Sequence, residues 1–140
     1  LAWLLRSTLS ALGDAVASAA ARSGTARRRL EAVVRAQLRV MAERPAACRI
    51  LIADLGRAAR MPDLAEAVGQ AFHAPVVQLL AEGASDGSWR KVNDPATVAS
   101  SIFGAVVIPA LDHLVAVGSL DPTRLAPPII RFVLNGLPGR

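Results

Sequence analysis

The sequence predicts an all-α fold of six helices, and three observations support this prediction. Apolar residues recur at intervals of three and four along most of the chain, as they do on one face of an α-helix. Alternation of apolar and polar residues, which is typical of strands, is absent. Proline, glycine and aspartate stand where helix ends are expected. Because 140 residues suffice for one core, we expect residues 1–140 to form a single domain.

Helical periodicity covers residues 2–22 and 26–43, with a break between them. Gly24 suits the left-handed end of the first helix, and Thr25 suits the start of the second. The second helix carries Gln37 inside its apolar stripe, and Pro45 ends it because proline lacks an N–H. The two apolar stripes consist of Leu5, Leu9, Leu12 and Val16, then Leu30, Val33, Val34, Leu38 and Met41.

The third and fourth predicted helices cover residues 46–59 and 63–85. Pro62 opens the fourth helix, in the first-turn position that tolerates proline. Pro75 lies in the middle of the same helix, so we expect a kink near residues 71–72, where a backbone carbonyl loses its usual donor. The buried face of the third helix is predicted to contain Cys48, Leu51, Ile52 and Leu55.

The last two predicted helices, residues 96–117 and 122–135, each follow an Asp-Pro pair that suits a helix start. The fifth helix is apolar nearly all round, and such a helix must be covered on two sides. We therefore expect the last two helices to form a four-helix interface with a second copy of the chain, a homodimer. The residues predicted for this interface are Val107, Leu111, Leu114, Leu125, Ile129, Phe132 and Val133.

Charge and composition limit the kinds of function that the sequence is consistent with. The net charge is +5, but the only dense basic run, residues 27–29, has no aromatic residues between its arginines, which favours a solvated helix start over a phosphate-binding patch. No charge-free run reaches the roughly 18 residues of a membrane span, so no membrane partner is expected. Cys48 is the only cysteine, which excludes a disulfide within the chain and fits a cytoplasmic protein.

The sequence predicts neither a catalytic site nor a metal site, and it implies no cofactor. No His-x-x-x-His or Glu-x-x-His pair is present to bind a metal. Cys48 and His73 would have to meet from different helices to form a nucleophile, and no local motif accompanies them. Asp112 and His113 lie near the predicted dimer face, where they either pair across it or face solvent at its edge.

The connection before the fifth helix resembles a motif of TetR-type transcriptional regulators. Residues 82–90 read E-G-A-S-D-G-S-W-R and precede Asn93-Asp94-Pro95, which is similar to the family pattern E-G-x-x-D-G-x-[FW]-R…D-P. The helix end M-A-E-R-P at residues 41–45 and the closing segment from Leu120-Asp121-Pro122 to the G-L of residues 136–137 also resemble the family. The likeness extends over nearly the whole chain.

This resemblance implies that the six helices are the fourth to ninth of a TetR-type repressor, its effector-binding and dimerisation domain. The helix-turn-helix would lie outside this sequence, and operator DNA would be bound through it and not through this chain. A ligand among the first five helices would shift the first helix and change the spacing of the two DNA-binding heads. The residues alone also allow a small helical enzyme, a carrier of lipid or another hydrophobe, or a membrane-surface protein.

We expect the effector to be a small apolar or aromatic molecule, because few charged residues face inward. Each apolar candidate also fits plain core packing. Gln37 and His73 are polar groups within or beside an apolar face, so each needs a partner, which either a ligand or a neighbouring backbone group would supply. Trp89 is expected to cap the end of the domain. The predicted ligand-binding residues are Gln37, Met41, Leu51, Leu55, Phe72, His73, Val76, Ile102, Phe103 and Val106.

Overall fold

A computed structural model describes residues 2–53 and 69–139 of the chain. These residues form six α-helices and one π-helical turn, and they contain no strand, which confirms the predicted all-α class. The elements are α1 (Ala2–Ala20), α2 (Ala26–Glu43), α3 (Pro45–Ala53), η1 (Gly69–His73), α6 (Ala74–Asp86), α7 (Pro95–Ala116) and α8 (Pro122–Gly136). The predicted helix parts at residues 54–59 and 63–68 lie outside the described residues.

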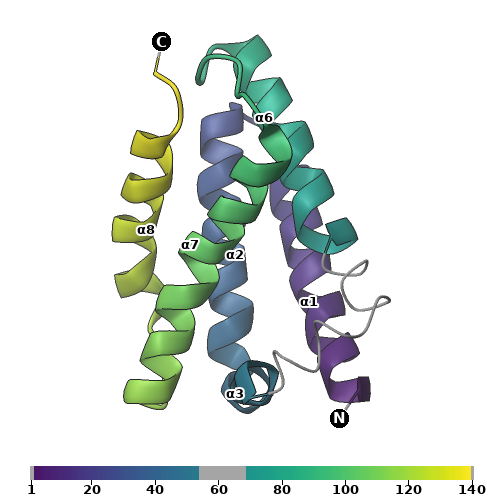
Figure 1. Ribbon diagram of the computed structural model, residues 1–140, viewed down its shortest axis with the longest axis vertical. Coiled ribbons are helices and arrows are strands. Elements are labelled where there is room, and N and C mark those ends of the chain that lie inside the picture. The colour runs from purple at the N-terminus through teal and green to yellow at the C-terminus, as the bar shows by residue number, and fades with distance from the viewer. Residues whose placement is uncertain (1, 54–68, 140) are drawn as a thin grey trace.

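The long helices run alternately up and down the molecule (Figure 1). α2 returns beside α1, and side-chain bonds link the pair near both ends: Arg44 Nη1 donates to Ser7 Oγ at 3.2 Å, and Arg29 Nη1 donates to the Ala20 carbonyl at 3.1 Å. α2 also packs against α6, α7 and α8, so it is the central helix of the bundle. α8 lies at one edge, and the C-terminus lies at the same end as the α6–α7 connection (Figure 1).

The predicted helix starts are confirmed by their capping bonds. Thr25 accepts a bond from the Arg28 N–H at 3.3 Å, and Asp94 accepts one from the Thr97 N–H at 3.3 Å. Asp121 likewise accepts from the Thr123 N–H at 3.1 Å. Each bond satisfies a backbone donor that the first turn of a helix leaves free. Some bounds differ slightly from the prediction, since α1 ends at Ala20 rather than at residue 22 and α3 starts at Pro45 rather than at residue 46.

Pro75 disturbs its helix at the expected place. The five residues before α6, Gly69–His73, form a π-helical turn, and Pro75 occupies the first turn of the regular helix that follows. Proline has no N–H to continue the ladder, and a wider turn is one way to accommodate this loss. The π-turn packs directly on α1: a Cβ added to Gly13 would lie 3.0 Å from the Cβ of Ala71. Gly13 therefore permits the close approach of these two segments.

The core runs through the bundle and draws on every described helix. Its largest fully buried side chains include Phe72, Leu30, Leu38, Met41, Leu79, Leu80 and Leu114. Among the described helices, α7 is the only one long and apolar enough to cross a membrane. It packs against α2, α3, η1, α6 and α8.

The prediction that α7 is covered on two sides is not met within one chain. Its inner face is buried, but Ile108 and Val115 are 57% and 68% exposed, and Val117 just beyond the helix is 70% exposed. On α8, Phe132 is 72% exposed. One apolar face of the α7–α8 pair is thus open to solvent in the single chain.

Candidate effector-binding region and exposed helix face

The predicted ligand-binding residues that the structure describes lie on α2, α3, the π-turn, α6 and α7. Leu55 and the side chain of Leu51 lie outside what the structure describes. His73 and Phe103 are half-buried. The other predicted residues are buried, namely Gln37, Met41, Phe72, Val76, Ile102 and Val106.

Three of the predicted residues form an aromatic group where the π-turn meets α7. The rings of Phe72 and Phe103 are 4.5 Å apart between centroids and inclined by 37°. The His73 ring meets Phe103 edge-on, with 6.1 Å between centroids. Such offset and edge-on arrangements are the favourable ones for aromatic rings. The structure therefore brings together residues that lie about thirty positions apart in the sequence.

Gln37 Oε1, His73 Nε2 and Thr8 Oγ1 are buried and have no hydrogen-bond partner among the residues that the structure describes. An unpaired buried polar group costs about 1–3 kcal/mol, so such groups are uncommon in natural cores. Gln37 was predicted from its place in an apolar stripe, but Thr8 was missed. Its signal in the sequence is its position one helical turn before Leu12, on the buried face of the first helix.

Gln37 and the aromatic group lie at a similar level of the bundle. Ser7 pairs with Arg44 and Ala20 with Arg29 along the antiparallel α1 and α2, so Gln37 lies across from about Gly13. Gly13 in turn touches Ala71, the residue before Phe72. Gln37 of α2 and the π-turn thus lie at a similar level along the bundle, and we call Gln37, Phe72, His73 and Phe103 together the middle layer.

Two surface grooves adjoin these elements. One, of about 440 Å³, lies between α1 and the π-turn and is lined by Gly13, Asp14, Ala71 and Pro75 among others. The second, of about 240 Å³, lies between α7 and α8 and is lined by Ser101, Ile102, Ala105 and Phe132 among others. Ile102 is the one predicted ligand-binding residue that lines either groove.

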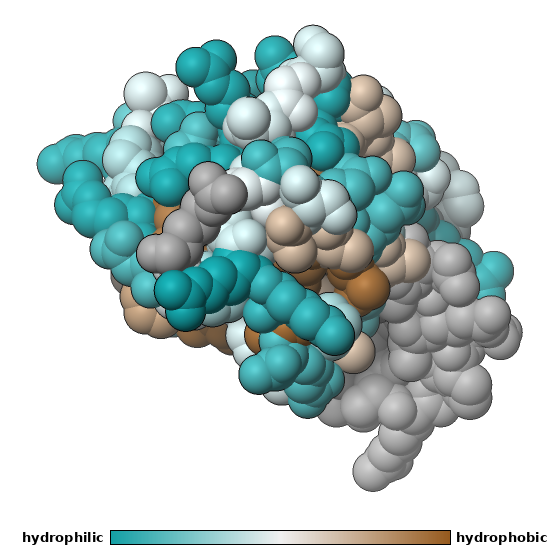
Figure 2. All heavy atoms as spheres, turned by 90° about the horizontal axis from the view of Figure 1, so that it is seen from above, coloured by the Kyte–Doolittle hydropathy of each residue, from teal (hydrophilic) through white to brown (hydrophobic). Residues whose placement is uncertain are grey.

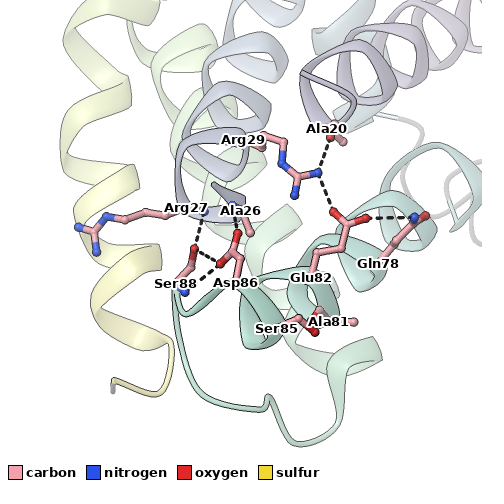
Figure 3. A network of polar contacts seen from close by, with 10 residues as sticks. All are labelled: Ala20, Ala26, Arg27, Arg29, Gln78, Ala81, Glu82, Ser85, Asp86 and Ser88. Carbon is pink, nitrogen blue, oxygen red and sulfur yellow. Dashed lines mark hydrogen bonds and ion pairs between the residues drawn. The ribbon is translucent and has the colours of Figure 1, made fainter. Parts of the chain in front are cut away.

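The E-G-x-x-D-G-x-W segment has a structural role at the end of the bundle (Figure 3). The Asp86 carboxylate accepts bonds from the Ala26 N–H at 2.7 Å and from the Ser88 hydroxyl at 2.6 Å. Ala26 opens α2, where the positive end of the helix dipole favours a carboxylate. The hydrogen bond from Ser88, and after it the one from Ala26, lower the pKa of Asp86. Asp86 thus ties the end of α6 to the start of α2.

Glu82 of the same motif fixes the turn between α1 and α2. Its carboxylate lies 2.6 Å from Arg29 Nη1, and that guanidinium also donates to the carbonyl of Ala20 at the end of α1 (Figure 3). Of the basic run, Arg27 and Arg28 are exposed as predicted, but Arg29 is half-buried in this network. Seen from above, this end of the molecule presents mostly hydrophilic residues (Figure 2).

Trp89 closes the end of the core, as predicted. It is 3% exposed, and its indole N–H donates to the Leu80 carbonyl at 2.9 Å. A Cβ on Gly83 would lie 2.1 Å from the indole ring, so only glycine leaves room for the tryptophan. Gly87 ends α6 with φ of 89°, a left-handed conformation that glycine adopts without strain. The motif therefore forms a packed helix end.

The residues predicted for the dimer interface divide into three groups. Leu111, Leu114, Ile129 and Val133 are buried in the chain's own core. Val107 and Leu125 are half-buried, and Phe132 is exposed. Ile108 and Val115, which were not among the predicted residues, are large apolar side chains of α7 that are exposed in the single chain. Asp112 and His113 are also exposed. Their part in an interface stays a prediction.

Cys48 is poorly suited to act as a nucleophile. It is 1% exposed, and burial raises the pKa of its thiol, although the nearby Arg44 opposes this effect. A buried thiol with a raised pKa is mostly protonated at neutral pH and therefore unreactive. Within residues 2–53 and 69–139, no three His, Cys, Asp or Glu side chains gather as metal ligands would.

Comparison with known families decides the relationship. The family model described as tetracyclin repressor-like, C-terminal domain matches residues 23–137. The chain belongs to this family. The match spans every described element from α2 to α8, and it confirms the resemblance drawn from the 82–95 segment. No curated protein and no solved structure gives a significant match to the sequence.

Membership makes the chain a TetR-like C-terminal domain, which is a regulator domain and not a member of an enzyme family. Such domains generally dimerise and bind ligands. The all-helical fold of the described residues agrees with this family.

Proposed function

We propose that this TetR-like domain is the ligand-responsive, dimerising half of a bacterial transcriptional repressor. A small apolar effector enters the core around the middle layer, and two copies pair through α7 and α8. Effector binding then changes the DNA affinity of a helix-turn-helix that lies outside this sequence. For the two events to be coupled, the effector must bind one conformation of the dimer more tightly than the other. The site of action we propose is the cytoplasm.

The observation that carries this proposal is the open apolar face of α7. Ser101, Ala105, Ile108, Asp112 and Val115 follow one another at intervals of four and three residues, and none of them is buried. This spacing repeats every seven residues, which is the pattern of a helix that packs along a second helix. Ile108 and Val115 are the large apolar members and are mostly exposed in one chain.

α8 continues the same face. Phe132 lines the groove between α7 and α8 together with Ser101 and Ala105, so its ring adjoins the α7 stripe. A large exposed apolar side chain at the centre of such a face is a usual anchor of an interface. Two copies related by a twofold axis would each contribute α7 and α8, which gives four helices at the interface. Asp112 lies within this stripe, where it would face the partner.

Sedimentation velocity on two matched variants tests the pairing. Phe132→Glu puts a charge on the proposed interface, so the dissociation constant of the dimer should rise at least a hundredfold, as for loss of about 3 kcal/mol at an interface anchor. Trp3→Glu makes the same kind of change at a side chain that is 77% exposed on α1, and it should leave the dimer intact. A dimer that survives Phe132→Glu at micromolar concentration would refute the proposed face.

A further inference from the structure

The middle layer defines a class of effector. We infer that the effector is an uncharged, planar apolar molecule that carries one hydrogen-bond donor, and that this donor binds Gln37 Oε1. The inference rests on the proposed function, because it names the kind of ligand that the same region takes.

The first support is the unpaired amide oxygen of Gln37. The side chain is 2% exposed, and its neighbours along the buried face of α2 are Val33, Val34, Leu38 and Met41. Its Oε1 has no hydrogen-bond partner among the described residues. A leucine at this position would bury a similar volume without an unsatisfied acceptor, so packing alone does not explain a glutamine. A donor on a bound ligand does.

The second support is the aromatic group that lies at a similar level of the bundle. Phe72 and Phe103 are tilted against each other, and His73 stands edge-on to Phe103, so ring faces and edges are concentrated at one level. Flat aromatic molecules pack well on such groups. The residues Phe72 and His73 belong to the π-turn, and π-turns inside helices are often found at functional sites. The unpaired His73 Nε2 offers a second polar contact.

The third support is that no charged side chain is classed as buried within residues 2–53 and 69–139. The buried polar side chains among the described residues are Thr8 and Gln37, and neither carries a charge. A charged effector would have to lose its hydration without an opposite charge to compensate, which is strongly unfavourable. A neutral hydroxyl or N–H group meets the Gln37 acceptor without this cost. The effector class is therefore a neutral aromatic alcohol, phenol or N–H heterocycle.

A pair of probes that differ only in the donor tests this inference. 1-Naphthol can donate to Gln37, while 1-methoxynaphthalene has the same rings and no donor. In equilibrium dialysis, the unaltered chain should bind 1-naphthol at least about tenfold more tightly than 1-methoxynaphthalene. Gln37→Leu should abolish this preference. Gln78→Leu, the same change at an exposed glutamine of α6, should preserve it.

Thermal unfolding of the ligand-free variants gives an independent readout. Because Gln37→Leu removes an unpaired buried acceptor, it should raise Tm by about 3–6 °C, whereas Gln78→Leu should not. Equal binding of the two probes by the unaltered chain would overturn the donor inference while leaving the apolar effector region standing. If neither probe binds, the effector region and the inference are overturned together. A fall in Tm for Gln37→Leu would also contradict the inference that Gln37 Oε1 is unpaired in the ligand-free chain.

Discussion

Gly83 is the position at which one added methyl group should test how Trp89 packs against the end of α6. In Gly83→Ala the new Cβ would lie 2.1 Å from Trp89 Cε2 and 2.2 Å from Cζ2, which is far inside van der Waals contact. Trp89 must therefore leave its site, where it is 3% exposed and bonded to the Leu80 carbonyl. The substitution thus displaces Trp89 from the core although the tryptophan itself is not mutated.

The expected magnitude follows from the burial of Trp89. Loss of a buried tryptophan from a core costs about 3–5 kcal/mol. Alanine is favoured over glycine within a helix by about 1 kcal/mol, which offsets part of this cost. The net destabilisation should be about 2–4 kcal/mol. At about 3 °C per kcal/mol for a chain of this size, Tm should fall by about 6–12 °C.

Urea unfolding followed by circular dichroism measures the effect, and a double-mutant cycle supplies the control. In a Trp89→Leu background the ring that clashes with the new Cβ is gone, so Gly83→Ala should cost much less there than in the unaltered chain. A neutral or stabilising Gly83→Ala in the unaltered chain would refute the packing argument. Equal costs in both backgrounds would show that the clash with Trp89 is not the cause.

Two further predictions concern single titratable groups. The pKa of Asp86 is lowered in the folded chain, so its contribution to stability is present above its unfolded pKa of about 3.9 and is lost as pH falls through the folded value. The Tm difference between the unaltered chain and Asp86→Asn should therefore shrink between about pH 5 and pH 2, and a difference that is constant with pH would contradict the assignment. Because Cys48 is buried and the pKa of its thiol is raised, a disulfide reagent at pH 7 should label the native chain at least about a hundredfold more slowly than the urea-unfolded chain, and comparable rates would contradict its burial.

Local chemistry made much of the fold predictable. Thr25, Asp94 and Asp121 were identified as helix starts because a short polar side chain before a helix can bond its free N–H groups. Pro75 marked the irregular turn because proline cannot donate to the ladder. These features depend on neighbours within four residues, so the sequence displays them directly.

Features that depend on distant partners were harder to predict. Periodicity showed that α7 is apolar all round, but it did not show which side the rest of the chain covers. Leu114 and Ile129 were therefore predicted for the interface although the chain buries them in its own core, and the exposed Ile108 was not among the predicted residues. Arg29 was grouped with its exposed neighbours because its partner Glu82 lies far along the sequence.

The residues of the candidate site also differ in whether a local pattern or a distant contact reveals them. Gln37 was found because it interrupts an apolar stripe. Thr8 was overlooked because threonine is common in helices. Only the packing of α1 shows that its hydroxyl is buried, with no partner among the described residues. The ring contacts of Phe72 and Phe103 join segments whose proximity no local pattern encodes.

Sedimentation equilibrium of the unaltered chain tests the central claim most directly. A TetR-like regulator domain that pairs through the open face of α7 and α8 should have twice the mass of the 14.6 kDa chain at low micromolar concentration. The interface should bury at least about 1,000 Å² in total, enough for a specific contact. A stable 14.6 kDa monomer up to about 100 μM would contradict the account, because dimerisation that weak implies an interface too poor to couple two DNA-binding heads.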